Sequence, residues 1–148
     1  MSGLIRRMEA SDAERVAALA AELGYAGASS GLVAQRLAAL GGRDDHAVWV
    51  SADGDDLLGL IHAQHMHRII SDPYAEILHL VVSERARRGG VGRALVACVL
   101  DWAAERGLDR VRVRSNVVRD AAHPFYLSLG FERHKTQHVY VSPVGPAR

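Results

Sequence analysis

The most chemically suggestive stretch of the chain is RARRGGVGRAL, residues 85–95, where arginines and glycines stand before a helical pattern. Glycine lets a backbone approach a ligand closely, and the first N–H groups of a helix lack intrahelical partners. Arginine guanidinium groups add charge-assisted donors that suit phosphate. The stretch predicts a phosphate-binding turn, and the alternative is a plain strand-to-helix turn with solvated arginines.

The residues of this turn exclude two common phosphate-binding motifs. A P-loop needs Gly-Lys-Ser/Thr, whereas Gly92 is followed here by Arg93 and Ala94. A dinucleotide-binding turn needs a third glycine at the position that Leu95 occupies. A nucleotide-binding function is therefore disfavoured.

The remaining pattern, Arg-x-x-Gly-x-Gly from Arg87 to Gly92, resembles the acyl-CoA pyrophosphate loop of the GNAT N-acetyltransferase superfamily. A second stretch, AAHPFYLSLGF at residues 121–131, is similar to the superfamily's Ala-x-x-x-Tyr-x-x-x-Gly-Phe helix. The matching positions in that helix are Ala122, Tyr126, Gly130 and Phe131. The order of predicted elements also matches, so the resemblance covers nearly the whole chain.

The resemblance implies acetyl-CoA as the cosubstrate and assigns residues to bind it. The backbone near the end of the fourth strand is expected to contact the pantetheine arm, with the Leu80 N–H facing the thioester carbonyl as an oxyanion donor. The amides of the turn are expected to hold the pyrophosphate. The implied cofactor-binding residues are Leu80, Val81, Val82, Arg87, Arg88, Gly89, Gly90, Val91, Gly92, Arg93 and Asn116.

The resemblance also implies two catalytic residues, Glu76 and Tyr126. Glu76 stands eleven residues before Arg87, a spacing similar to that of the catalytic glutamate in the histone-acetyltransferase branch. We expect it to take the proton of the amine, directly or through a water chain. Tyr126 matches the general acid that protonates the departing thiolate. The alternatives are a solvated strand-edge glutamate and a core tyrosine.

Alternation along the strand AEILHLVVS, residues 75–83, predicts which side chains share a face. Period-two counting places Glu76 with the face of Leu80 and Val82 and turns His79 away from it. Among the other histidines only His65 and His67 share a strand face, so no metal site is expected.

Two residues depart from the family pattern. Arg119 stands where many members carry a second asparagine. Pro124 removes a backbone donor, so it fits only the first turn of a helix and affects the aim of Tyr126.

The elements that must position these residues follow from apolar patterning. Helices are expected from Ser11 to Gly24, from Ser29 or Ser30 to Gly41, over 91–106 and up to Leu129. Strands are expected over 4–8, 47–51, 56–66, 75–83, 109–116 and 131–141, with Asp53-Gly54 as a hairpin turn. The predicted fold class is α/β, with one mixed sheet flanked by helices. The resemblance specifies a GNAT fold whose mostly antiparallel sheet splays between strands 4 and 5.

Length and composition restrict the class of protein. The 148 residues fit a single domain, 1–148, with a frayed tail at about 143–148. Eighteen basic and 17 acidic side chains give a net charge of +1, which argues against a nucleic-acid partner. No apolar run approaches the ~20 residues of a membrane span, so we expect no membrane partner and a cytoplasmic location. The lone Cys98 is expected to be a buried structural thiol.

The expected function is transfer of acetyl from acetyl-CoA to a primary amine of a small molecule. The alternatives are a protein lysine or N-terminal acetyltransferase and, from another class, a non-catalytic acyl-CoA sensor. A homodimer is compatible with the resemblance. The sequence does not name the acceptor amine, because the loops at 24–30 and 69–74 carry no specific motif.

Overall fold

The computed structural model describes residues 3–25, 27–114 and 122–145. These residues fall into two compact units that divide after Arg114. The first unit holds the sheet, the glycine-rich turn at residues 85–92 and Glu76. The second holds Tyr126.

The first unit is built on a five-stranded sheet in the order β1-β2-β3-β4-β5. The first four strands are antiparallel neighbours, and β5 joins β4 in parallel. This confirms the predicted mixed, mostly antiparallel sheet. The strands are β1 (Leu4–Arg7), β2 (His46–Asp53), β3 (Asp56–Met66), β4 (Tyr74–Val82) and β5 (Val111–Val113).

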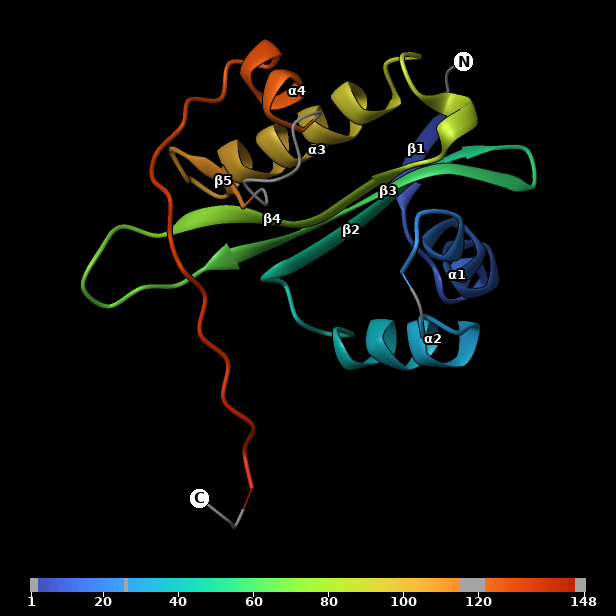
Figure 1. Ribbon diagram of the computed structural model, residues 1–148, viewed down its shortest axis with the longest axis horizontal. Coiled ribbons are helices and arrows are strands. Elements are labelled where there is room, and N and C mark those ends of the chain that lie inside the picture. The colour runs from blue at the N-terminus through green and yellow to red at the C-terminus, as the bar shows by residue number, and fades with distance from the viewer. Residues whose placement is uncertain (1–2, 26, 115–121, 146–148) are drawn as a thin grey trace. The chain divides into compact units, whose positions relative to one another are not determined.

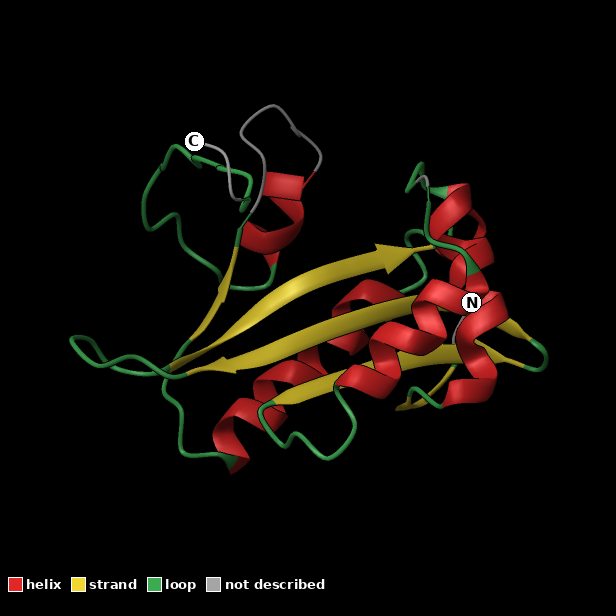
Figure 2. Ribbon diagram, turned by 90° about the horizontal axis from the view of Figure 1, so that it is seen from below, coloured by secondary structure: helices red, strands yellow, loops and turns green. Residues whose placement is uncertain are grey.

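Helices cover both faces of this sheet (Figures 1 and 2). On one face lie α1 and α2, and α3 lies along the other. The helices are α1 (Ala13–Glu22), α2 (Ser30–Ala39) and α3 (Val91–Glu105), with short 3-10 turns at Ala10–Asp12 and Glu84–Ala86. This layering gives β3 and β4 two covered faces with different neighbours.

The α3 face of the sheet is an apolar contact. The helix buries the stripe that its four-residue spacing predicts: Val91, Leu95, Val99 and Trp102. Trp102 meets Trp49 of β2 edge-on, with ring centroids 6.0 Å apart. Such aromatic pairs add to the stabilisation from buried apolar area.

The start of α1 differs from the expected cap. Ser11 is exposed and begins no helix; a capping box between Glu9 and Asp12 begins the 3-10 turn that leads into α1. The buried Asp12 carboxylate accepts from the Glu9 N–H at 2.8 Å and from both terminal nitrogens of Arg6 at 2.8 Å. Hydrogen bonding to Arg6 lowers the pKa of Asp12. The expected Ser29 cap of α2 is confirmed, since its hydroxyl accepts from the Leu32 N–H at 3.3 Å.

The second unit contains α4 (Ala122–Ser128) and an extended segment. Pro124 lies in the first turn of α4, where a missing N–H is tolerated. The predicted strands over 131–141 are wrong, because residues 131–145 contain no strand. A strand needs a neighbour for its backbone groups, and side chains such as Val139 and Tyr140 remain exposed.

Candidate functional site

The turn between β4 and α3 presents unpaired backbone donors at the start of a long helix. Gly90 is the N-cap of α3 with φ +83°, and no side chain caps it. Arg88 also has positive φ, at 67°. The first intrahelical donor is the Ala94 N–H, which bonds to the Gly90 carbonyl at 3.0 Å. The N–H groups before Ala94 therefore lie at the positive end of the helix dipole.

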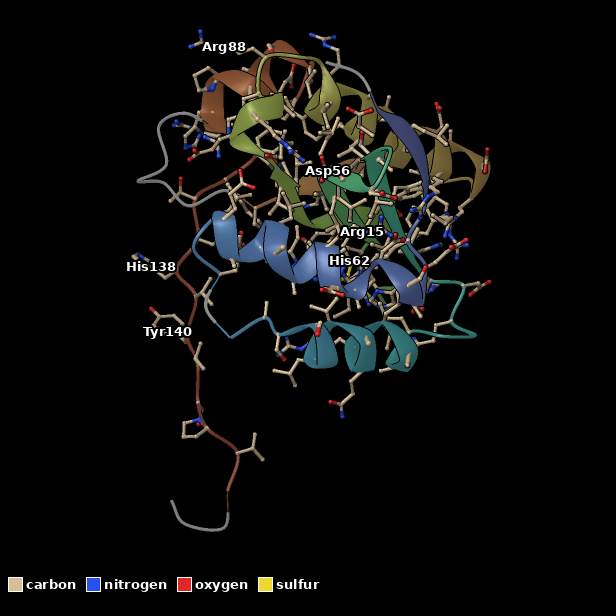
Figure 3. The ribbon with its side chains drawn as sticks, turned by 90° about the vertical axis from the view of Figure 1, so that its right-hand side faces the viewer. Arg15, Asp56, His62, Arg88, His138 and Tyr140 are labelled. Carbon is tan, nitrogen blue, oxygen red and sulfur yellow. The ribbon has the colours of Figure 1, made fainter. Side chains whose placement is uncertain are left out.

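Three exposed arginines surround this turn: Arg87, Arg88 and Arg93. Within the described part of the chain none of them forms an ion pair, whereas the neighbouring Arg85 reaches Asp56 at 3.4 Å. The Arg88 side chain lies at the outer edge of the molecule (Figure 3). Among the described residues the Arg87 and Gly89 N–H groups donate to the Glu84 and Ala86 carbonyls, each at 3.3 Å, which leaves the amides from Gly90 to Gly92 for a ligand. These amides and the three guanidinium groups together suit a phosphate ligand.

Glu22, at the last position of α1, holds the entry to the turn. Its Oε1 accepts from the Ser83 hydroxyl at 2.9 Å and from the Glu84 N–H at 3.1 Å. Ser83 is fully buried and its N–H donates to the Leu58 carbonyl at 2.8 Å. Sequence reasoning missed Glu22, because its partners lie more than sixty residues along the chain and no local motif connects them.

Among the described residues, the edge of β4 toward β5 has a partner strand only over a short ladder. The parallel pairing ends at Ile77 and Val113, while β4 continues to Val82. The ladder ends where β5 ends, so the predicted splay between strands 4 and 5 stays a prediction. Because the Ser83 N–H points to β3, alternation turns the backbone groups of Val82 and Leu80 toward that edge.

Val81 has the opposite orientation. Alternation points its backbone groups at β3, and its side chain packs against the apolar cluster that includes Val16 and Leu19 of α1. Val81 therefore contributes to the packing between β4 and α1.

A β-bulge in β4 overturns the predicted faces of that strand. His62 of β3 pairs with His79, but the next residue, Ala63, pairs with Ile77, so Leu78 has no partner on β3. An extra residue reverses the alternation on its far side. Glu76 therefore shares its face with His79, and the expectation that it shares a face with Leu80 and Val82 is wrong.

The Glu76 carboxylate is buried on the α1 and α2 face of the sheet. Only 8% of its side chain is exposed, and its Oε1 accepts from the Arg114 Nε at 3.1 Å. The guanidinium compensates a charge that burial would otherwise leave costly. Arg114 follows β5 directly, so the end of that strand fixes the orientation of the carboxylate.

Tyr126 lies in α4, and its surroundings are described within the second unit. Its ring meets Phe125 and Phe131 edge-on, with centroids 5.1 and 5.6 Å away. The Phe131 N–H donates to the Tyr126 carbonyl at 3.1 Å and closes the end of the helix. Asn116 and Arg119 lie outside the described residues.

The histidines at 65 and 67 and the lone cysteine are the other residues with sequence-based predictions. His65 and His67 do share a face, with rings stacked at 4.1 Å, and His65 accepts from the Arg106 Nε at 2.9 Å. Cys98 is half-buried, and burial raises the pKa of its thiol. Among the described residues no cluster of His, Cys, Asp and Glu has the geometry to hold a metal. None of the described helices is both long and apolar enough to span a bilayer.

Known proteins resemble this chain in sequence. The sequence model described as acetyltransferase (GNAT) family matches residues 6–131. A curated relative, N-acetyltransferase family 8 member 3 of Mus musculus, is 31% identical over 100 residues. That match covers 64% of this chain and 42% of the relative. The chain thus spans about two fifths of the length of that relative.

Solved structures share the fold at low sequence identity. Aminoglycoside N-acetyltransferase AAC(6')-Iy, in complex with a bisubstrate analogue of CoA, has a TM-score of 0.84 at 18% identity and covers 97% of this chain and 100% of its own. Glucosamine-6-phosphate N-acetyltransferase from Arabidopsis thaliana has a TM-score of 0.83 at 19% identity, with 95% and 99% covered.

Proposed function

The chain belongs to the acetyltransferase (GNAT) family, and from that premise we propose that it transfers acetyl from acetyl-CoA to a primary amine of a small molecule. We treat residues 1–148 as one domain with this activity. The observation that carries the proposal is the edge of β4 beyond Ile77, which has no strand partner on the β5 side among the described residues and runs directly into the donor-rich turn before α3. Acetyl-CoA has an extended pantetheine arm attached to a pyrophosphate, which matches a strand edge followed by a phosphate-binding turn.

In this proposal the cofactor lies along the backbone from β4 to α3. Leu80 and Val82 contact the pantetheine arm, and Asn116 supports it from the segment after β5. The amides of Gly90, Val91 and Gly92 hold the pyrophosphate, together with the side chains of Arg87, Arg88 and Arg93. Gly89, whose N–H donates to the Ala86 carbonyl at 3.3 Å, shapes the turn and lets the ligand approach. Val81, also implied by the family resemblance, supports this strand through its packing under α1.

The reaction joins the amine nitrogen to the thioester carbonyl carbon and breaks the carbon–sulfur bond. The Leu80 N–H donates to the carbonyl oxygen as negative charge develops there. Glu76 accepts the proton that the nitrogen loses during attack, and Tyr126 gives its proton to the departing thiolate. The buried position of Glu76 on β4 supports its role, and the family helix motif supports that of Tyr126.

A small-molecule acceptor is favoured over a peptide by two kinds of similarity. Several structural neighbours that match nearly the whole of both chains are named for aminoglycoside or amino-sugar substrates. The 121–131 stretch is also more similar to members that acetylate small molecules than to those that acetylate ribosomal proteins.

The experiment that tests this function measures free CoA thiol released from acetyl-CoA. Aminoglycosides, polyamines, amino acids, aminophosphonates and lysine peptides are supplied as acceptors, and acetyl-CoA binding is measured in parallel. Glu76→Gln should lower turnover most at low pH, and Tyr126→Phe should lower it across the pH range, each by about 100-fold or more.

Each outcome separates two candidate functions. Turnover with one class of small amine supports the proposal and names the acceptor, whereas turnover with peptides alone identifies a protein acetyltransferase. Tight acetyl-CoA binding without turnover, unaffected by either substitution, would identify a sensor. If both variants turn over as fast as the wild type, Glu76 and Tyr126 are not the base and the acid of the reaction.

A further inference from the structure

Three histidines form a row across the sheet on the same face as Glu76. They are His46 of β2, His62 of β3 and His79 of β4. The His46 Nδ1 and the His62 Nε2 are 2.9 Å apart, which is a hydrogen bond, and the rings of His62 and His79 stack with centroids 6.5 Å apart. Burial, with the charges of His46 and His79, lowers the pKa of His62 to about 4. His62 is therefore neutral near neutral pH, and His79 is the exposed end of the row.

The exposed end of the row leads to a hollow in the segment between α1 and α2. The ring of Tyr25 meets His79 edge-on, with centroids 6.1 Å apart. Tyr25 also lines a hollow of about 400 Å³, whose other described lining residues are Ala21, Gly24, Gly27, Ala28 and Ser29. None of these side chains carries a charge. The described lining therefore holds no carboxylate that could pair with an ammonium ion.

An aliphatic amine arrives mostly as ammonium near neutral pH, and its nitrogen must lose two protons to become an amide. One leaves before attack, to free the lone pair, and the other leaves during attack. The overall reaction takes R–NH3+ and the thioester to the amide, the thiol and one H+. Because Tyr126 supplies the thiol proton and Glu76 accepts the second proton from nitrogen, the first proton needs a separate acceptor.

We propose that His79 is this first proton acceptor and that it deprotonates the ammonium group as the acceptor enters the hollow beside Tyr25. The inference rests on the proposed acetyl transfer. An imidazole ring carries a basic nitrogen, so it can take a proton from a bound ammonium and pass it on to solvent. The exposure of His79 provides that release, whereas the buried Glu76 has no equivalent path.

The groups facing His79 fit this role. His62 and His46 face it from β3 and β2, Tyr25 from the segment after α1, and Glu76 lies along the same face of β4 in its ion pair with Arg114. A neutral His62 adds no positive charge beside His79 when that ring takes a proton. The stacked ring of His62 is then a positioning residue for His79.

The test compares two amines of similar size and different basicity. Ethylamine is protonated near neutral pH, whereas 2,2,2-trifluoroethylamine is largely neutral there. We expect His79→Gln to lower kcat/KM for ethylamine by about 10- to 100-fold near neutral pH and for trifluoroethylamine by less than about twofold. The deficit with ethylamine should shrink as the pH rises and the amine deprotonates in solution. His67 is an exposed histidine that directly follows β3. His67→Gln is therefore the matched control and should change neither rate.

The outcomes separate this inference from the function on which it rests. Equal losses with both amines, or no loss with either, overturn the role of His79. A wild-type protein that binds acetyl-CoA and acetylates neither amine also overturns it, since the hollow then does not admit simple amines. A wild-type protein that fails to bind acetyl-CoA contradicts the proposed function itself. Both variants should bind acetyl-CoA as the wild type does in equilibrium dialysis, and loss of binding by His79→Gln counts against the inference.

Discussion

The two faces of the central sheet do different work. On the α3 face, apolar side chains such as Leu95 and Trp102 pack the helix against β2 and β3, and no buried charge is found among the residues described there. On the α1 and α2 face, β4 carries a buried carboxylate and the end of a histidine row. One face packs against α3, the helix that follows the glycine-rich turn, and the other holds Glu76 and the histidine row.

Under the proposed function, this difference separates cofactor binding from proton transfer. The α3 face is a rigid support, because close packing in an apolar interface leaves its helix a single position. The opposite face tolerates polar groups because each has a partner: Glu76 has Arg114, and His62 has His46. We therefore expect substitutions near α3 to change acetyl-CoA binding or stability, and substitutions in the histidine row to change the pH dependence.

The largest effect is expected at Gly90, where the turn meets α3. Its φ of +83° lies in the left-handed region, and nothing lies within 4 Å of an added Cβ, so a substitution strains only the backbone. Gly90→Val should weaken acetyl-CoA binding by about 100-fold or more, which is about 2.7 kcal/mol. Gly90→Asn is the matched control, because asparagine adopts positive φ more readily, and it should lose less than about tenfold. Equal affinities for both variants would mean that the turn has only a structural role.

A second substitution tests the support itself. A Cβ on Gly59 of β3 would lie 3.0 Å from the Val81 carbonyl oxygen and 3.1 Å from a Val91 methyl. Gly59→Ala should therefore cost about 2 kcal/mol of unfolding free energy and displace the start of α3. Urea unfolding measures the cost, and Gly31→Ala is the control, since that helical site in α2 has open space and alanine favours helix. A Gly59→Ala protein as stable as the wild type would show that the packing there is loose.

The sequence predicted the α3 face well and the opposite face poorly, for physical reasons. A helix packed on a sheet repeats apolar residues every three to four positions, so Val91 to Trp102 stood out as a stripe. The five strands and the turn before α3 were also predictable from alternation and glycine. Strand alternation, however, assumes one residue per position, and the unpaired Leu78 reverses it between Glu76 and His79. No local pattern marks such a bulge.

Long-range contacts were equally hidden. In the sequence, Glu22 is only the end of a helix and Ser83 only the end of a strand. The hydrogen bond between them forms only when the chain folds. The Arg114 partner of Glu76 belongs to the same class of contact. The predicted strands over 131–141 failed because alternation indicates a preference, while a strand forms only against a neighbour.

Glu22 connects the two faces, and its substitution should have a moderate effect. Removing the carboxylate in Glu22→Ala leaves the Ser83 hydroxyl and the Glu84 N–H without their acceptor, at a cost of about 1 kcal/mol. We expect the KM for acetyl-CoA to rise about fivefold while kcat changes little, because the turn loses its anchor and the chemistry keeps its groups. Glu22→Gln keeps an oxygen acceptor and should lie near the wild type. A fall in kcat with unchanged KM would place Glu22 on the acceptor side instead.

The smallest effect is expected from the buried histidine, and it depends on pH. Burial lowers the pKa of His62 from 6.5 to about 4, so between these values the unfolded chain binds a proton that the folded chain rejects. The contribution of His62 to stability is thus present above its ordinary pKa and lost as the pH falls toward 4. Because the ring keeps partial contact with solvent, screening reduces this contribution to about 1 kcal/mol, or about 2–4 °C in Tm.

His62→Phe preserves a flat ring between His46 and His79 and cannot titrate, so its Tm should fall less steeply than that of the wild type as the medium is acidified across this window. His67→Gln, at an exposed position, should keep the wild-type slope. Thermal unfolding followed by circular dichroism over that range measures both. Identical slopes for His62→Phe and the wild type would show that the centre of the row is open to water. The sheet would then lack the contrast between an apolar α3 face and an opposite face that keeps His62 partly out of solvent.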